Sequence, residues 1–153
     1  MNATLTLAEL TSRTGLDVLD HLEREVTIPI VDGLQAQGDL LVVPVALVSG
    51  LTVPDRARWQ DVPPSGIVLL RSSAGGNPHT LVADPATCRW TPDVLDPPAL
   101  ALGVLTATAP VHLIHPEHGA TGIAPGRYAV RRQREREMGM SSGFFPGNRL
   151  IAD

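Results

Sequence analysis

The sequence predicts a mainly β protein, an antiparallel β-sandwich or a small β-barrel that follows a short N-terminal helical pair. From residue 27 onward, short runs rich in β-branched residues alternate with turn signals made of Gly, Pro, Asn and Asp. No segment between those runs has the apolar spacing of a helix, which argues against a parallel sheet with crossover helices. With 153 residues, the chain is long enough for one domain. Its core must be aliphatic, because aromatic residues make up only 3% of the chain.

We expect a single domain with three parts: a helical segment at residues 1–25, a β-rich core at 26–137 and a C-terminal arm at 138–153. The helical segment opens with Thr6-Leu-Ala-Glu9, which has the form of a capping box. A break at Gly15 then separates a first helix from a second helix that runs to Glu25. The apolar positions of this segment are Leu7, Leu10, Leu16, Leu19 and Leu22.

The helical segment resembles the helix-turn-helix of repressors, in its Leu-Ala-Glu-Leu opening and in the Thr-Gly-Leu at its turn. The resemblance spans Thr6–Glu23 and implies DNA binding through the second helix. That helix carries four acidic residues against the single Arg24, and DNA phosphates repel such a surface. DNA binding is therefore our second alternative function, and we favour a packing or interface role for the two helices.

Seven strands are expected in the β-rich core, each bounded by turn residues. They are Thr27–Val31, Leu40–Val48, Gly66–Arg71, His79–Ala83, Leu100–Ala107, Val111–His115 and Gly126–Arg134. The longest apolar run, Leu40–Val48, contains Pro44 and is too short to span a bilayer. We therefore expect no membrane partner.

Charge and cysteine content give an expectation about compartment and partners. The net charge is −4, so no global field attracts nucleic acid or an anionic membrane. The single cysteine, Cys88, has no intramolecular disulfide partner, which fits a reducing compartment. Charged residues interrupt the apolar N-terminus, which is not the pattern of a signal peptide. We expect a cytoplasmic protein whose partner is itself or another protein subunit.

Three histidines gather between residues 112 and 118. This cluster is compatible with a metal site, but we favour histidines that lie at the surface or in a turn fixed by Pro116 and Gly119. On a strand, His112 and His115 point to opposite faces because side chains alternate. Pro116 then ends the strand and places the next residues in a turn. The feasible ligands for one divalent ion are His79, His115, Glu117 and His118.

Histidines and a glutamate around one metal ion in a small β-barrel resemble the cupin family, although the chain lacks that family's His-x-His pair on one strand. The resemblance implies a metal-dependent enzyme that oxidises or isomerises a small molecule. This is our first alternative function.

Two surface features have no place in a catalytic set. A strand that continues past Tyr128 presents Arg132, Arg134 and Arg136 on one face, and the arm carries the only two phenylalanines of the chain. The sequence contains no Gly-x-Ser-x-Gly and no phosphate-binding glycine loop. The sequence therefore favours a non-enzymatic binding or assembly module, which forms a homo-oligomer or part of a larger complex. The expected contact residues are Arg132, Arg134, Arg136, Phe144 and Phe145.

Overall fold

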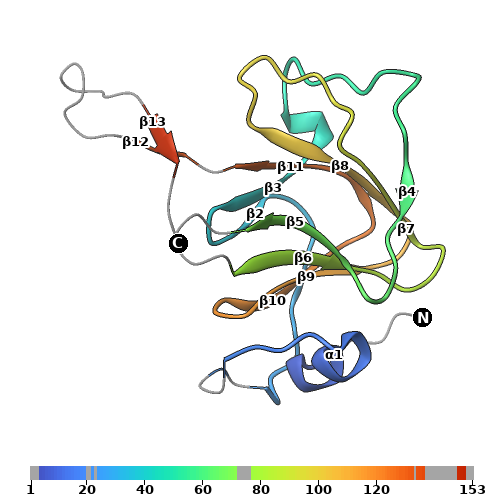
Figure 1. Cartoon of the computed structure of the whole chain (residues 1–153), viewed down its shortest axis with the longest axis vertical. Helices are drawn as coiled ribbons and strands as arrows, with labels where there is room; N and C mark the ends of the chain where they lie inside the picture. Colours follow the sequence, from blue (N-terminus) through green and yellow to red (C-terminus); the bar gives the residue numbers. More distant parts are fainter. Residues whose placement is uncertain are drawn as a thin grey trace.

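A computed structural model describes residues 4–19, 22, 24–71, 77–132, 134–136 and 148–150. These residues are mainly β, as the sequence predicts, and form two large sheets, a separate pair of strands and one short helix (Figure 1). Within this part of the chain the sheets do not close into a barrel. The helix is too short to cross a membrane.

The first sheet has five strands among the described residues. In spatial order these are β1 (Ile30–Val31), β10 (Gly119–Ile123), β9 (Val111–His115), β6 (Pro78–Val82) and β5 (Ile67–Arg71). All neighbours are antiparallel except β1 and β10, which run parallel. Strand β5 is an edge of this sheet.

The second sheet has six strands in the described part of the chain. In spatial order these are β2 (Gln35–Gln37), β3 (Leu40–Pro44), β11 (Gly126–Arg132), β8 (Ala101–Ala107), β7 (Cys88–Thr91) and β4 (Gln60–Asp61). All its neighbours are antiparallel. The predicted strand Leu40–Val48 ends at Pro44, because Val45–Leu47 form a 3-10 turn.

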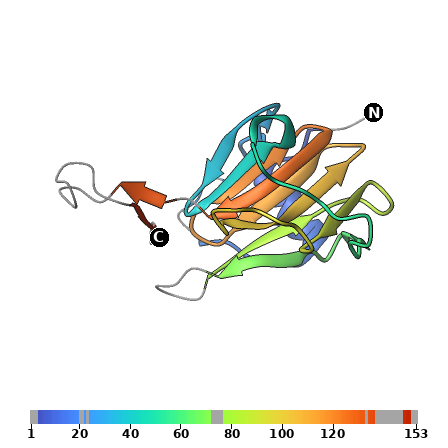
Figure 2. The same ribbon diagram turned by 90° about the horizontal axis from the view of Figure 1, so that it is seen from above.

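The two sheets face each other and share one hydrophobic core, which is mostly aliphatic and also contains Trp90 and Tyr128 (Figure 2). Side chains alternate along each strand, so every second residue points into the space between the sheets. The first sheet contributes Leu81, Val111, Leu113 and Ile123, and the second contributes Leu40, Val42, Leu105, Tyr128 and Val130. All nine side chains are almost completely buried.

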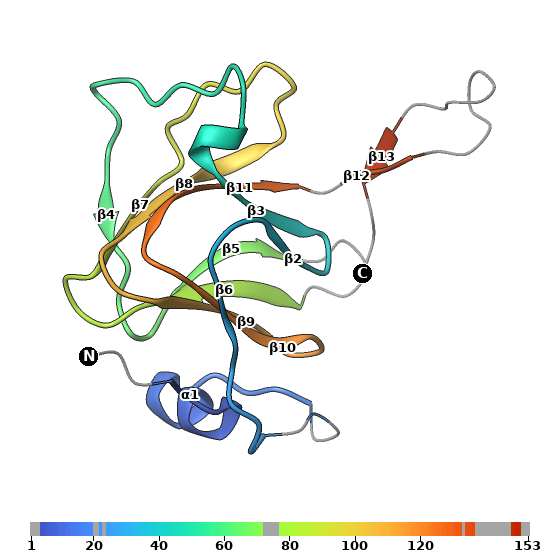
Figure 3. The same cartoon turned by 180° about the vertical axis from the view of Figure 1, so that it is seen from behind.

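Helix α1 (Leu7–Thr14) covers the outer face of the first sheet, beneath β9 and β10 (Figure 3). The predicted capping box is present: Glu9 N donates to Thr6 Oγ1 at 3.1 Å, and Thr6 N donates to Glu9 Oε1 at 2.9 Å. Leu7 and Leu10 form a second apolar cluster with residues of β6 and β9. The members of this cluster from the sheet are Val82 and Ile114.

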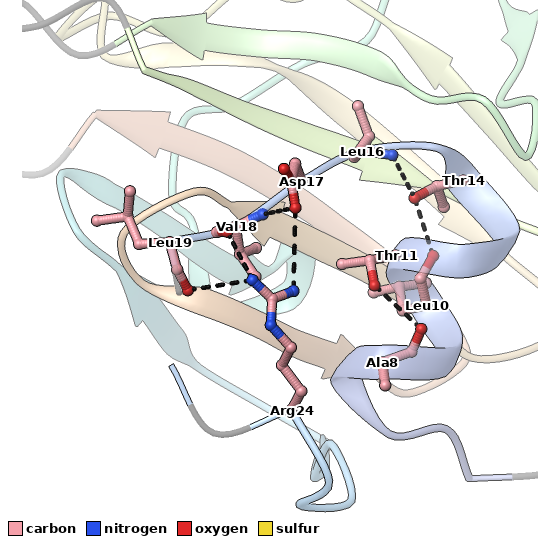
Figure 4. A network of polar contacts seen from close by, with 9 residues as sticks. All are labelled: Ala8, Leu10, Thr11, Thr14, Leu16, Asp17, Val18, Leu19 and Arg24. Carbon is pink, nitrogen blue, oxygen red and sulfur yellow. Dashed lines mark hydrogen bonds and ion pairs between the residues drawn. The ribbon is translucent and has the colours of Figure 1, made fainter. Parts of the chain in front are cut away.

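The predicted second helix is not present in residues 15–19, 22 and 24–25, so a helical pair is not confirmed. Gly15 ends α1 with a left-handed φ of 75°. The backbone after Gly15 forms other hydrogen bonds. Arg24 Nη2 donates to the carbonyls of Val18 and Leu19 (Figure 4). Leu19 N donates to Pro116 O. The Arg24 side chain and the turn between β9 and β10 thus supply hydrogen bonds to this segment, and the described residues contain no helix-turn-helix.

The chain after the second sheet forms a separate pair of strands. Strand β11 ends at Arg132, two residues before the predicted end. Strands β12 (Arg134–Arg136) and β13 (Asn148–Leu150) then pair antiparallel and lie outside the two large sheets (Figures 1 and 3). We call this pair the C-terminal hairpin.

Candidate functional site

A cluster of polar side chains is buried between the sheets at one end of the core. His79 lies near the start of β6 and His115 at the end of β9, and both side chains are 0% exposed. The second sheet contributes Gln37, the last residue of β2, and Asp39, from the turn before β3. Four polar residues from three distant segments of the chain therefore meet in the interior. We call them the buried polar cluster.

The hydrogen bonds of His79 fix its protonation. Its Nδ1 lies 3.0 Å from Gln37 Oε1, and its Nε2 lies 2.9 Å from Asp39 Oδ1. The orientation of the Gln37 amide is not ambiguous, because its Nε2 donates to the backbone carbonyl of Leu113 at 2.9 Å. Both ring nitrogens therefore face acceptors, and each must donate a proton. His79 thus has the contacts expected of an imidazolium that is paired with the carboxylate of Asp39.

His115 holds the turn between β9 and β10. Its Nδ1 accepts hydrogen bonds from the backbone N–H groups of Glu117 at 3.0 Å and His118 at 3.3 Å. Because the lone pair of Nδ1 is used in this way, the ring proton is on Nε2. The three rings are close together: the centroid of His115 lies 4.3 Å from that of His79 and 4.6 Å from that of His118.

The structure brings the four predicted metal ligands together, but their hydrogen bonds do not suit ligation. Ligand atoms of His115, Glu117 and His118 lie within 4.8 Å of one another, and the ring of His79 packs on His115. A histidine binds a metal through a free lone pair. In His79 both nitrogens donate, and in His115 the lone pair already accepts from the turn. With His79 and His115 engaged in this way, at most two of the four residues could ligate, whereas a catalytic zinc site uses three protein ligands.

The alternation predicted for β9 agrees with the structure. His112 lies on the outer face of the first sheet, where it lines a pocket beside α1, and His115 lies on the inner face with His79. The two histidines therefore lie in different environments on opposite faces of the sheet. The residues that sequence analysis missed are Gln37 and Asp39, since a Gln-Gly-Asp turn has no pattern that marks it as a partner of a distant histidine.

The predicted contact residues lie at the end of β11 and beyond it, where Arg132 pairs with Leu40, the residue after Asp39. Arg132 is exposed at the end of β11. Arg134 and Arg136 are in β12, where their backbones pair with Leu150 and Asn148. The side chains of these two arginines, and all of Phe144 and Phe145, lie outside the described residues.

The neighbouring Arg131 has a structural role that the sequence did not reveal. Its Nη2 lies 3.4 Å from Asp96 Oδ2. The same carboxylate oxygen accepts from the backbone N–H groups of Leu100 and Ala101, at 3.0 and 2.8 Å. Asp96 thus joins the start of β8 to β11 and fixes the loop that precedes β8.

Two facing β-sheets, a buried polar cluster and a separate hairpin define a mainly β domain. The chain belongs to the family described as Domain of unknown function (DUF8820), whose sequence model matches residues 36–133. The match includes all four residues of the buried polar cluster and leaves out α1 and the C-terminal hairpin. No curated protein and no solved structure matches the chain significantly.

Proposed function

We propose that the protein is a non-enzymatic assembly module, a β-sandwich that forms a homo-oligomer through its C-terminal hairpin. The observation that carries this proposal is the position of β12 and β13, which pair only with each other among the described strands and extend outside both sheets. An isolated two-stranded hairpin is marginally stable in water. Contact with a second surface would supply the missing stabilisation, and most oligomers are symmetric assemblies of one chain.

The residues enclosed by the hairpin support the same proposal. The pairing of Arg136 with Asn148 closes a segment that contains Phe144 and Phe145. Burial of each phenylalanine against a partner would contribute about 2 kcal/mol. Large aromatic side chains and arginines are also the residue types that most often dominate the energy of protein interfaces.

The body of the protein offers an edge on which a strand of a second copy can dock. Strand β5 pairs with β6 and has no second neighbour among the described strands. Its side chains are mostly apolar, and Val68 is 46% exposed. An apolar edge strand of five residues is a template for pairing with another chain. We therefore propose that the hairpin of one copy reaches the β5 edge of another.

The buried polar cluster does not favour an enzyme. Its histidines donate to a carboxylate and an amide, or hold a turn, and such bonds stabilise a particular packing of the two sheets. The single cysteine is a buried free thiol, which supports the proposed cytoplasmic location.

The test compares the mass in solution of the full chain with that of the double variant Phe144→Ser/Phe145→Ser, measured by light scattering. We expect the double variant to have a lower mass in solution than the parent at equal concentration. The matched controls are Leu47→Ser and Leu95→Ser, which remove side chains that are 67% and 62% exposed on the body of the protein. Equal masses for the parent and the double variant would reject the hairpin as the contact, and loss of assembly in the controls would indicate unspecific association.

A further inference from the structure

A pocket of about 460 Å³ lies on the outer side of the first sheet, between α1 and the adjoining ends of β6 and β9. Its volume falls in the range of small-molecule sites, roughly 300 to 1,000 Å³. Much of the wall is apolar and comes from Leu5, Leu10, Val82 and three prolines. The pocket is on the opposite face of the sheet from the buried polar cluster, and the proposed assembly does not use it.

His112 is the most deeply buried of the polar side chains that line this pocket. It is 7% exposed, and its Nε2 is buried without a hydrogen-bond partner among the residues that the structure describes. Desolvation by burial lowers the pKa of His112, so the ring is neutral at physiological pH. A neutral imidazole carries one N–H and one lone pair. A buried polar group without a partner costs stability, which a ligand would recover by accepting the N–H bond.

Two opposite charges also line the pocket. Arg13, in the last turn of α1, has its Nη1 3.8 Å from Oδ1 of Asp84, which follows β6. The two side chains are 54% and 62% exposed, and an ion pair of this length and exposure contributes little stability. The guanidinium of Arg13 is thus close to a weak partner that a better one can replace.

We propose that this pocket binds a short aliphatic carboxylate. The carboxylate accepts hydrogen bonds from Arg13 and His112, and the alkyl chain lies against Leu10 and Val82. Arginine is suited to this role because its planar guanidinium can hold a carboxylate through two parallel N–H bonds. Asp84 disfavours a simple carboxylate by repulsion, but it would pair with the ammonium group of an α-amino acid.

The experiment is a titration of the full chain with hexanoate, followed through the imidazole signals of His112 by NMR. We expect saturable shifts of these signals. The variant Arg13→Gln should weaken binding by about tenfold, as loss of one charge-assisted contact implies, and Asp84→Asn should tighten it. The matched controls Arg56→Gln and Asp55→Asn change exposed charges outside the pocket and should leave the affinity unchanged.

Two further ligands identify the source of the carboxylate. If the natural ligand is an α-amino acid, leucine binds more tightly than hexanoate and loses this advantage in Asp84→Asn. If it is a short fatty acid, hexanoate binds more tightly than leucine. Absence of a hexanoate shift at His112, an unchanged affinity in Arg13→Gln, or equal binding of hexylamine would overturn the proposal. None of these results bears on assembly, which is measured separately by mass.

Discussion

The substitution Asp39→Ala removes the counter-ion of the buried polar cluster. In the folded protein, Asp39 Oδ1 lies 2.9 Å from Nε2 of His79, and the His79 ring is 0% exposed. Alanine at this position takes away the carboxylate that Nε2 of the buried His79 ring faces. The other ring nitrogen keeps its bond to Gln37, so the ring cannot turn to find a new partner without losing that bond.

The expected loss follows from the burial of both partners. Removal of one member of a buried ion pair costs about 3 to 5 kcal/mol, because the remaining charge is left unpaired away from water. The side chain of Asp39 is 11% exposed, so some water reaches the pair and we expect the lower value, about 3 kcal/mol. A domain of ordinary stability, about 5 to 15 kcal/mol, would remain folded.

Urea unfolding at neutral pH measures this loss. The midpoint should fall and the slope with denaturant concentration should stay unchanged. The matched control is Asp55→Ala, which removes an exposed carboxylate and should leave the midpoint in place. A double-mutant cycle with His79→Phe adds a second criterion, since the double variant should lose less stability than the two single variants together. Strict additivity, or an Asp39→Ala midpoint equal to that of the control, would refute the assigned ion pair.

Three further predictions concern other buried groups. Burial lowers the pKa of His112 below its ordinary value of 6.5, so the unfolded chain takes up a proton at a higher pH than the folded protein. The melting temperature should therefore decline as the pH falls below 6.5, and less so in His112→Gln; equal declines in both proteins would contradict this. Burial raises the pKa of Cys88 to about 12. A thiol reagent at mildly alkaline pH should therefore label the folded protein far more slowly than the protein in urea. Labelling of the folded protein at the rate of a free thiol would contradict this prediction. The substitution Asp96→Ala removes the acceptor of Leu100 N, Ala101 N and Arg131, and should lower the unfolding free energy by about 2 kcal/mol in urea. The matched control is Asp93→Ala, because the partner of Asp93, Arg58, is exposed. An equal loss of unfolding free energy in both variants would contradict the structural role assigned to Asp96.

The strands that sequence analysis predicted best are short β-branched runs between prolines. Strand β9 has the predicted bounds, Val111–His115, because Pro110 and Pro116 limit it on both sides. The run Leu40–Val48 was predicted as one strand, but after Pro44 the chain turns, with Val48 N donating to Val45 O. Hydrophobicity alone could not show this turn, since every residue on both sides of it is apolar.

Sequence analysis missed β10, since the glycines of Gly-Ala-Thr-Gly-Ile favour a turn. In the structure, Gly122 allows β1 to approach closely: a Cβ at this position would lie 2.9 Å from Pro29 O and 2.8 Å from Ile30 Cγ1. Gly103 has a similar role in β8, where a Cβ would lie 2.4 Å from Thr91 O. These glycines mark close contacts between neighbouring segments, which local sequence patterns do not distinguish from turns.

The sequence predicted which histidines lie together in the candidate site, but it did not predict their hydrogen-bond partners. The sequence placed His79 near His115 and His118, and the structure brings the three rings together. Their chemistry depends on Gln37 and Asp39, which are about forty residues from His79 and reach it only when the second sheet covers the first. The predicted second helix failed for a related reason, because Arg24 and Pro116 supply hydrogen bonds that a local pattern does not contain.

Native mass spectrometry of the full chain over a range of concentrations tests the proposed assembly most directly. The account predicts a closed oligomer with a mass that is a multiple of 16.2 kDa, which dissociates when Phe144 and Phe145 are replaced by serine. A mass of 16.2 kDa at every concentration would contradict the proposal that the C-terminal hairpin joins copies of this chain.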